Sequence, residues 1–469
     1  MRRSATLPPW SLFLGLTIVG LVAGLLVAGF LSLPAVTAIA PAPGAQNVSS
    51  RAPIRLTFNH PMVRSSVEAA FKLTPAHEGA FSWDSNTLTF TPAQPWPVGQ
   101  LITVSVAGST GERGLPLKGR AIWAFSVSQP RIAYLAGSIP NLWTLGLAEA
   151  AQPQQVTSET VGIASYDVSP DGQSFIYAAQ RADGGADLRT VNVDGTSPAV
   201  LLDCPSMACL SPAVSPDGQH VAYQRQALTG SASGENVPGA SHIHIYSPAT
   251  GQDESIGEEA NEARSPRWSP DGRLSYYDVT RQAIVVRDLA SGAVTYIPDL
   301  SGEMGTWSPD SQYLVFPELS FPAEQAPDSA IGVGEAPSHF SSRMVRVTVT
   351  TNDKIDLSGP GQVDDGSPDF SPLGDWLAFA SKGLSNSAQW TPGRQIWLMH
   401  PDGQSAHPLT NDPLYTHSAL AWNAEGTALV YMRFNATAPD QPAEIWTIGA
   451  DGSGARRLVT GGYLPTWLP

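Results

Sequence analysis

The sequence predicts an all-β protein in which a small β-sandwich precedes a β-propeller, with an apolar segment at the N-terminus. Three observations lead to this fold class. Glycine and proline are frequent, at 43 and 41 of 469 residues, and they are scattered along the chain. The apolar runs between them have the length of strands and are bounded by turn residues. The tetrapeptide Ser-Pro-Asp-Gly then recurs through the C-terminal part, which indicates a repeat architecture.

The composition restricts the classes of function. Apolar residues make up 42% of the chain, enough for a buried core, while charged residues make up 14% and the net charge is −15. An acidic surface repels the phosphates of nucleic acids. The sequence contains no basic cluster beyond Arg2 and Arg3. We therefore expect no nucleic-acid partner.

The N-terminus predicts a membrane anchor. Residues 10–36 form an uncharged, mostly apolar stretch that is long enough to cross a bilayer. Two arginines precede it and no Lys or Arg follows before Arg51, so the positive-inside rule places residues 1–9 in the cytoplasm. The alternative is a signal peptide, uncleaved or cleaved at the Ala-Ile-Ala sequence of residues 38–40. The expected localisation is the cell membrane, crossed once, with the C-terminal body outside the cytoplasm.

Residues 41–128 predict a small β-sandwich, because short apolar runs alternate with turns at the spacing of sandwich strands. The runs are Ile54–Phe58, Phe71–Leu73, Leu88–Phe90, Ile102–Val106 and Ile122–Val127. Five pieces occur in the order 43–48, 54–62, 79–83, 88–92 and 123–127, and through them the segment resembles the bacterial Ig-like domain family of surface-layer and envelope proteins, of the SbsA type. The resemblance implies a spacer or adhesion module without catalysis.

The repeated tetrapeptide is typical of a tight turn between two strands. Complete copies occupy residues 169–172, 215–218 and 269–272, and degenerate copies occupy 308–311, 371–374 and 423–426. Proline presets one turn dihedral, Asp bonds to its own backbone and Gly accepts a positive φ. Strand-like runs flank each copy, and the copies start 39 to 63 residues apart. Each copy is therefore expected to join the first and second strands of a propeller blade.

The two ends of the repeat array predict a closed ring. Residues 132–157 contain three strand-like runs with no first strand before them, and residues 464–469 look like a first strand with nothing after it. Together they would complete one blade, which removes the exposed edges of an open array. With the six copies of the turn, this composite blade predicts a seven-bladed propeller over residues 131–469. Six or eight blades are the alternatives.

Two copies extend the motif by a preceding tryptophan, giving Trp-Ser-Pro-Asp-Gly at residues 268–272 and Trp-Ser-Pro-Asp at 307–310. Through this signature the repeat region resembles the TolB-like propeller family, whose repeats are also called WD40-like PD40 repeats. The resemblance implies a bacterial binding or assembly protein, although some members are propellers attached to serine peptidases. TolB itself is described as six-bladed, so the expected count of seven departs from it.

The two cysteines, Cys204 and Cys209, are close in the sequence. In an oxidising compartment such a pair can close a small loop, and a disulfide is what we expect. The alternatives are two free thiols, or a metal site for which no further ligands lie nearby.

The sequence contains no recognisable catalytic motif. There is no nucleophile elbow, zinc-protease motif, phosphate-binding loop or EF-hand loop. The best metal candidate is the His-Ile-His sequence of residues 242–244, where two imidazoles share one face of a strand. A solvated strand face is the other interpretation of this pair, and we adopt it. We expect a protein that is not an enzyme and that needs no metal and no cofactor.

The topology of a propeller places a candidate site on one face. Links between blades lie on the same face as the connections from second to third strands, and the longest connections are of that kind, at residues 226–241, 318–342, 382–393 and 433–443. Function concentrates on loops that a rigid scaffold carries. The residues that enter the central channel on this face are therefore the expected ligand-binding residues. They are Tyr166, Asp167, Arg264, Arg267, Glu303, Asp365, Asp369, His417 and Tyr463.

These features together predict a membrane-anchored, extracytoplasmic scaffold. Its propeller would present a binding face to an envelope or extracellular protein, a peptide or a glycan. One alternative is a hydrolase or lyase that acts on an extracellular polymer with a metal at the channel. Another alternative is a structural component of a surface layer.

Overall fold

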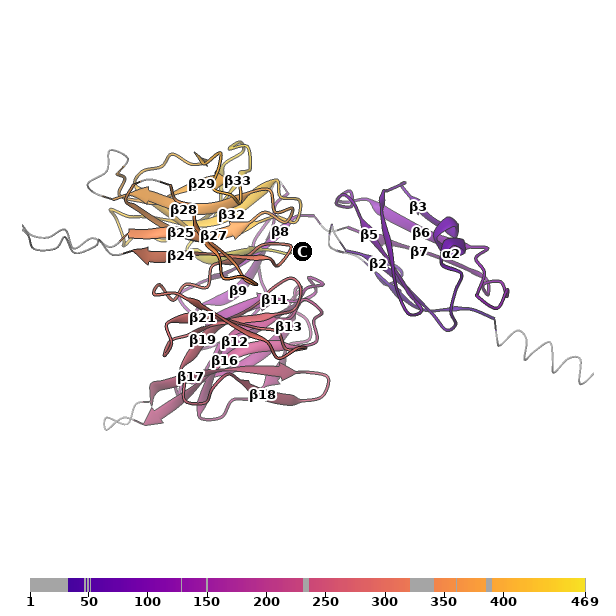
Figure 1. The fold of residues 1–469 in the computed structure, drawn as a ribbon, viewed down its shortest axis with the longest axis horizontal. Helices are drawn as coiled ribbons and strands as arrows, with labels where there is room; N and C mark the ends of the chain where they lie inside the picture. Colours follow the sequence, from indigo (N-terminus) through magenta and orange to yellow (C-terminus); the bar gives the residue numbers. More distant parts are fainter. Residues whose placement is uncertain are drawn as a thin grey trace, which may run out of the picture. The chain divides into compact units, whose positions relative to one another are not determined.

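The computed structural model describes residues 33–45, 48, 50, 52–127, 129–148, 151–230, 236–320, 341–359, 361–384 and 390–468. The chain divides into two compact units, Met1–Ser128 and Gln129–Pro469. Figure 1 colours the first unit indigo to purple and the second magenta to yellow. Apart from one short helix, the regular elements of the described residues are all strands, which confirms the predicted all-β class.

The first unit is a sandwich of two antiparallel sheets. The sheets have the orders β1-β2-β5-β4 and β3-β6-β7. Their elements are β1 (Val36–Ala40), β2 (Ile54–Phe58), α2 (Arg64–Ala70), β3 (Phe71–Thr74), β4 (Gly79–Asp84), β5 (Thr87–Pro92), β6 (Leu101–Ala107) and β7 (Arg120–Ser126). Inward-facing residues of both sheets, including Leu56, Val104 and Phe125, form one buried core.

The membrane prediction is corrected by the start of this unit. Residues 10–32 of the predicted span lie outside the described residues. No helix in the described part of the chain is long and apolar enough to cross a membrane. Val36 already begins β1, and the predicted cleavage sequence at residues 38–40 lies inside this strand, paired with β2. These findings overturn the prediction of a single-pass cell-membrane protein.

The second unit consists of antiparallel sets of four strands (Figure 1). Six sets follow the chain. They are β11 (Ile163–Val168), β12 (Ser174–Gln180), β13 (Ala186–Asn192) and β14 (Ala199–Leu202); β15 (Met207–Val214), β16 (Val221–Gly230), β17 (Asn236–Ser247) and β18 (Gln252–Ile256); β19 (Ala263–Trp268), β20 (Leu274–Asp278), β21 (Ala283–Arg287) and β22 (Val294–Pro298); β23 (Thr306–Trp307), β24 (Tyr313–Ser320), β25 (Ser341–Thr348) and β26 (Lys354–Asp356); β27 (Val363–Phe370), β28 (Leu377–Gly383), β29 (Gln395–Met399) and β30 (His407–Pro408); β31 (Tyr415–Trp422), β32 (Ala428–Asn435), β33 (Glu444–Gly449) and β34 (Arg456–Thr460).

A further set combines both ends of the unit. Its order is β10-β9-β8-β35, with β8 (Arg131–Ala136), β9 (Asn141–Gly146), β10 (Gln154–Gln155) and β35 (Gly462–Trp467). The C-terminal strand therefore pairs with the first strand of the unit, as the sequence predicts. The number of blades stays a prediction, because single parallel contacts join two pairs of sets into eight-stranded sheets. The joining contacts are Ala186 with Ala208 and Ser342 with Asp364.

The Ser-Pro-Asp-Gly turns join the first and second strands of their sets. In the copy at residues 169–172, the Ser169 hydroxyl donates to the Asp171 carboxylate over 2.7 Å and accepts the backbone N–H of Ser174 over 2.9 Å. Gly172 has a φ of 67°, which a residue with a side chain adopts only under strain. The serine thus couples the turn to the strand that follows it.

The core of the second unit lies between the sets. One cluster joins Ala133 and Leu135 of β8 to Phe175 and Tyr177 of β12, and the other clusters also combine residues from neighbouring sets. Trp268, Trp422 and Trp467, which occupy equivalent places at the ends of first strands, donate their indole N–H to a backbone carbonyl of the preceding set. Tryptophan before the turn therefore holds neighbouring sets together.

The long connection predicted at residues 226–241 is partly regular. Its two ends extend β16 and β17, which pair as far as Gly230 with Asn236. Gly, Ser and Pro in this segment indicated a loop. Instead, the antiparallel pairing of β16 with β17 extends beyond the part of β17 that pairs with β18.

Candidate ligand site in the propeller channel

The first strand of most sets bends at a bulge. The pairing register shifts inside β15, β19, β27, β31 and β35. The residues at these bulges have a positive φ of 49° to 58°, and they are Ser211, Ser265, Ser367, Ala419 and Leu464. A positive φ is uncommon outside glycine, and a bulge re-aims the side chains beside it. These bulges shape the inner wall of the unit.

Two cavities lie along this wall. The larger has a volume of about 550 Å³ and is lined by residues of β11, β15, β19 and β23 and by nearby turns. The smaller, of about 370 Å³, is lined by residues of β19, β23, β27 and β31 and by the segment that precedes β23. Ser265, Arg267, Gly305 and Thr306 line both cavities. The two cavities therefore form one continuous candidate site around β19 and β23.

Five of the nine predicted ligand-binding residues line these cavities. Tyr166, Asp167 and Arg267 line the larger one, and Arg267, Glu303 and Asp369 line the smaller one. The remaining four, which line neither cavity, are Arg264, Asp365, His417 and Tyr463. The structure thus brings together predicted residues of β11, β19 and β27 and of the segment that precedes β23. The other four predicted residues lie outside the lining of the site.

Tyr166 joins the site to the closing set. Its hydroxyl donates to the backbone carbonyl of Leu464 over 2.6 Å and lies 3.1 Å from that of Ala133. Burial raises the pKa of Tyr166, so the hydroxyl stays protonated and remains a donor. Tyr463 packs against the cluster that contains Phe175. Both tyrosines therefore stabilise the junction of β11 with β35.

Asp167 and Asp369 occupy equivalent positions on β11 and β27 and hold the next set through its backbone. Asp167 accepts the N–H of Val168 and, from β15, that of Val214, both over 2.8 Å. Asp369 accepts the N–H of Trp422, on β31, over 3.0 Å. Burial raises the pKa of both carboxyl groups, to about 7 for Asp369, against the opposing effect of the Arg267 charge. Each aspartate is a contact between sets as well as part of the cavity wall.

Replacement of Asp369 by Asn should flatten the dependence of stability on pH. The pKa of Asp369 in the folded protein, about 7, lies above the value near 3.9 expected for an unfolded chain. The folded state thus binds more protons between these values, and the wild type loses stability as the pH rises through this window. Asn still accepts the N–H of Trp422. We therefore expect the free energy of unfolding of Asp369→Asn, measured relative to the wild type, to be about 1–2 kcal/mol higher at pH 8 than at pH 4. This value includes an allowance for solvent screening.

Urea denaturation at a series of pH values measures this effect. Asp451→Asn is the matched control, because Asp451 is exposed and its pKa is lowered, first by the Ser453 hydroxyl. Its effect on the free energy of unfolding should stay constant between pH 5 and pH 8. An equally constant effect of Asp369→Asn would contradict the raised pKa.

Asp365 and His417 are buried between sets instead of facing the channel. Asp365 is 2% exposed and its carboxylate accepts the Ser358 hydroxyl, while His417 is fully buried and its Nδ1 donates to the carbonyl of Arg394 over 2.7 Å. Burial lowers the pKa of His417 to about 4, so the ring is neutral at physiological pH. These side chains lie two residues before the bulge, where a first strand faces the neighbouring set.

Arg264 lines neither cavity, although its guanidinium lies beside Gly302, a lining residue of the smaller one. Its guanidinium lies 5.4 Å from the centre of the Tyr277 ring, a cation–π contact within the same set. Glu303, by contrast, is exposed in the smaller cavity.

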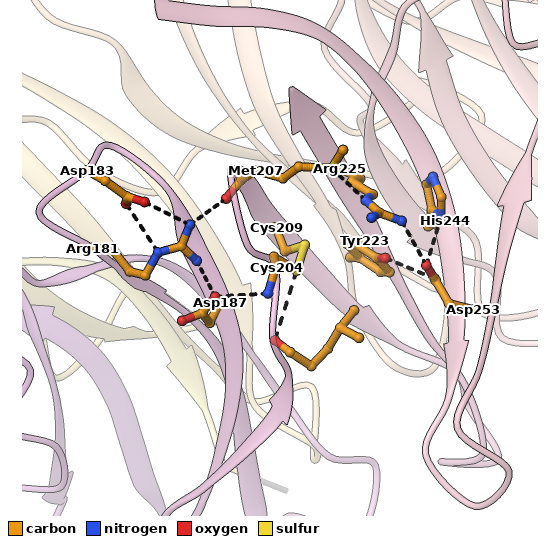
Figure 2. Close-up of a disulfide and its surroundings, with 11 residues drawn as sticks. Arg181, Asp183, Asp187, Cys204, Met207, Cys209, Tyr223, Arg225, His244 and Asp253 are labelled. Carbon is orange, nitrogen blue, oxygen red and sulfur yellow. Dashed lines mark hydrogen bonds and ion pairs between the residues drawn. A yellow bond between two sulfur atoms is a disulfide. The ribbon is translucent and has the colours of Figure 1, made fainter. Parts of the chain in front are cut away.

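The histidine pair at residues 242 and 244 belongs to a different cluster, on β17. Nδ1 of His244 lies 3.2 Å from the Asp253 carboxylate, which also accepts the Tyr223 hydroxyl over 2.9 Å and an N–H of Arg225 over 3.1 Å. Figure 2 shows these three side chains converging on Asp253. Within the described ranges, no group of three or more His, Cys, Asp and Glu side chains could hold a metal ion.

The same view shows the disulfide between Cys204 and Cys209 (Figure 2). Cys204 lies in the link between β14 and β15, and Cys209 lies on β15, both almost fully buried. The backbone N–H of Cys204 donates to the Asp187 carboxylate over 3.0 Å, and Asp187 also pairs with Arg181. The disulfide thus fixes the chain where it enters the second set.

Loss of this disulfide should reduce stability by about 2 kcal/mol, the value expected for closing so short a loop. We expect the double variant Cys204→Ser, Cys209→Ser to show this loss in urea denaturation without reductant. Dithiothreitol should lower the stability of the wild type by a similar amount and leave the variant unchanged. Equal midpoints for oxidised and reduced wild type would contradict this role.

Sequence reasoning missed the residues of the bulges themselves. Ser265 lines both cavities, and Ser211 lines the larger one. The signal that could have found them is a second Ser-Pro pair, four residues before the Ser-Pro of the turn, at residues 211–212, 265–266 and 367–368. The turn and the bulge together form the repeat.

An Ig-like sandwich and a propeller of four-stranded sets define the chain as a multidomain all-β protein. Residues 32–127 match the model of the bacterial Ig-like domain family. The chain is similar to TolB from Acinetobacter baumannii, at 12% identity over 85% of this chain and 83% of that one, with a TM-score of 0.42. It is also similar to the β-propeller domain of the Trilobed protease from Pyrococcus furiosus, at 11% identity over 64% and 83% of the two chains, with a TM-score of 0.43.

A third similar structure belongs to a study of two prolyl endopeptidases. It is 14% identical over 71% of this chain and 49% of that one, with a TM-score of 0.50. A likeness at this identity shows the propeller fold alone. No curated protein matches the chain significantly. The resemblance to bacterial Ig-like domains is confirmed for residues 32–127, and TolB structures are among those to which the chain is similar.

Proposed function

We propose that the protein is a non-enzymatic interaction scaffold whose propeller receives a peptide segment of a partner protein in its channel. The observation that carries the proposal is the continuous site of two cavities that share Ser265, Arg267, Gly305 and Thr306. Concave sites with a few polar groups on a rigid scaffold are the usual places of ligand recognition. The Ig-like unit suits the role of a spacer that carries the propeller.

The partner that we propose is a protein or peptide of an oxidising compartment, such as the envelope or the extracellular space. The disulfide between Cys204 and Cys209 supports this choice, because such bonds persist where the surroundings are oxidising. A peptide is preferred to a glycan because the short side chains and backbone groups of the bulged strands suit an extended chain.

Filling the channel tests the proposal. Ala213 lines the larger cavity, and its backbone carbonyl, which accepts the indole N–H of Trp268, is kept in any substitution. Peptides would be selected from a random display library on the wild-type protein and their affinities measured by fluorescence polarisation. We expect Ala213→Phe to weaken their binding at least tenfold.

The matched control is Ala290→Phe, at an exposed position in the turn between β21 and β22. This variant should bind the selected peptides as the wild type does. Peptides that bind all three proteins equally would show that the channel is not the site, and the proposal would then fail.

A further inference from the structure

Arg267 has hydrogen-bonding capacity that the fold does not use. The side chain is exposed, belongs to β19 and lines both cavities. In the described part of the chain, no carboxylate forms an ion pair with it. Two other arginines are occupied, since Arg394 pairs with Asp364 over 2.6 Å and Arg264 lies on the Tyr277 ring. Arg267 therefore presents unused N–H donors to the channel.

The acidic groups near Arg267 are used differently. The two oxygens of Asp167 accept backbone N–H groups of Val168 and Val214, and Asp369 accepts that of Trp422. These carboxylates attract Arg267 across the channel without contacting it. The acceptor capacity of these two carboxylates holds neighbouring sets together. Glu303 has an exposed carboxylate, but it lines the smaller cavity only, so the unused charged groups where the two cavities meet are the donors of Arg267. A ligand that complements them must supply an acceptor, and preferably a negative one.

The walls beside Arg267 favour a peptide over a sugar. The two tryptophans that line the larger cavity are committed to packing. Trp307 is 8% exposed and donates its indole N–H to the Ser275 hydroxyl over 3.1 Å, while Trp268 donates to the Ala213 carbonyl over 3.0 Å. Ser265, by contrast, lines both cavities with a short polar side chain, and an extended backbone can pass such a side chain beside the guanidinium.

We infer that Arg267 binds the C-terminal carboxylate of a peptide that enters the channel, so that the site recognises a chain end. This inference rests on the proposed function and assigns the chemistry of its ligand. The planar guanidinium matches a carboxylate through two parallel hydrogen bonds, a geometry that an amide cannot reproduce. The chain end lies between Ser265 and Thr306, where the two cavities meet.

The test compares two probes on the full-length protein. N-acetyl-tetraalanine with a free carboxylate and the same peptide as a C-terminal amide differ only in the group that Arg267 would bind. Affinities at pH 7.5 and low salt are measured by ligand-observed NMR. We expect the acid to bind the wild type at least tenfold more tightly than the amide. In Arg267→Gln this preference should fall below twofold.

Arg264→Gln is the matched control, because Arg264 lies on the same strand and lines neither cavity. It should keep the full preference for the acid, and thermal unfolding checks that both variants fold. Equal binding of acid and amide, or a preference that survives Arg267→Gln, would overturn the inference and leave the channel proposal intact. Tighter binding of an oligogalacturonate than of the acid peptide would overturn the choice of a peptide. If neither probe binds, the inference also fails, and the Ala213→Phe experiment decides separately whether the channel binds peptides.

Discussion

A chain that ends at Gly461, and so lacks β35, should lose the cooperative unfolding of its propeller. Four pairs of residues join β35 to β8, and Leu468 donates its backbone N–H to Arg131 over 2.9 Å. Removal of the strand leaves β8 with an open edge that other chains can pair with. It also removes Trp467, whose indole N–H binds the Ala421 carbonyl, and the Leu464 carbonyl that the Tyr166 hydroxyl binds.

The expected loss in the free energy of unfolding is about 5 kcal/mol or more, since buried side chains and a complete ladder are lost together. Calorimetry should show a broad transition at lower temperature, and size-exclusion chromatography should show aggregates. A synthetic peptide of residues 461–469 added in trans should restore part of the loss. Leu464→Ala is the control, because this side chain is 44% exposed and its truncation should cost less than about 1 kcal/mol. An unchanged transition in the shortened chain would show that β35 does not close the unit.

The sequence predicts most of the fold because the turns are local. A Ser-Pro-Asp-Gly turn is specified by four neighbouring residues, and the bonds of Ser169 to Asp171 and Ser174 span no more than five positions. The pairing of β35 with β8 spans more than 300 residues, yet it follows from counting which strands lack partners. The number of blades is harder to predict, because the parallel contact of Ala186 with Ala208 joins two sets into one sheet.

The N-terminus shows the limit of pattern reasoning. An uncharged apolar stretch predicted a span as far as residue 36, but Val36–Ala40 pairs with β2 as an edge strand. Small and β-branched apolar residues suit an edge strand as well as a membrane helix. Composition alone does not separate these two environments, and the partner strand, 15 or more residues away, decides between them.

The candidate site could be predicted only in part, because the direction of a side chain depends on the bulge. Asp365 and Asp369 lie on the same first strand, and both were predicted to enter the channel. The bulge between Gly366 and Asp369 shifts the register, so that Asp369 lines a cavity while Asp365 faces Ser358 of the preceding set. A uniform two-residue alternation does not describe a strand with such a shift.

Trp422 should be among the most sensitive single residues of the propeller, and Trp422→Ala should cost about 3–5 kcal/mol. The side chain is 7% exposed and packs in a cluster that joins Ile396 and Leu398 of β29 to Leu429 of β32. Its indole N–H also donates to the carbonyl of Asp369 over 3.1 Å. The substitution therefore removes packing and a hydrogen bond at one junction between sets.

Two further variants separate these contributions in urea denaturation. Trp422→Phe keeps an aromatic ring in the cluster and removes the indole N–H, which leaves the Asp369 carbonyl without that donor, so it should cost about 1–2 kcal/mol. Trp390→Ala is the control for the residue type, because Trp390 is 52% exposed and should contribute less than about 0.5 kcal/mol. If Trp422→Ala cost no more than Trp390→Ala, the tryptophan before the turn would not be a link between sets. The repeated Trp-Ser-Pro-Asp-Gly sequence would then specify the turn alone.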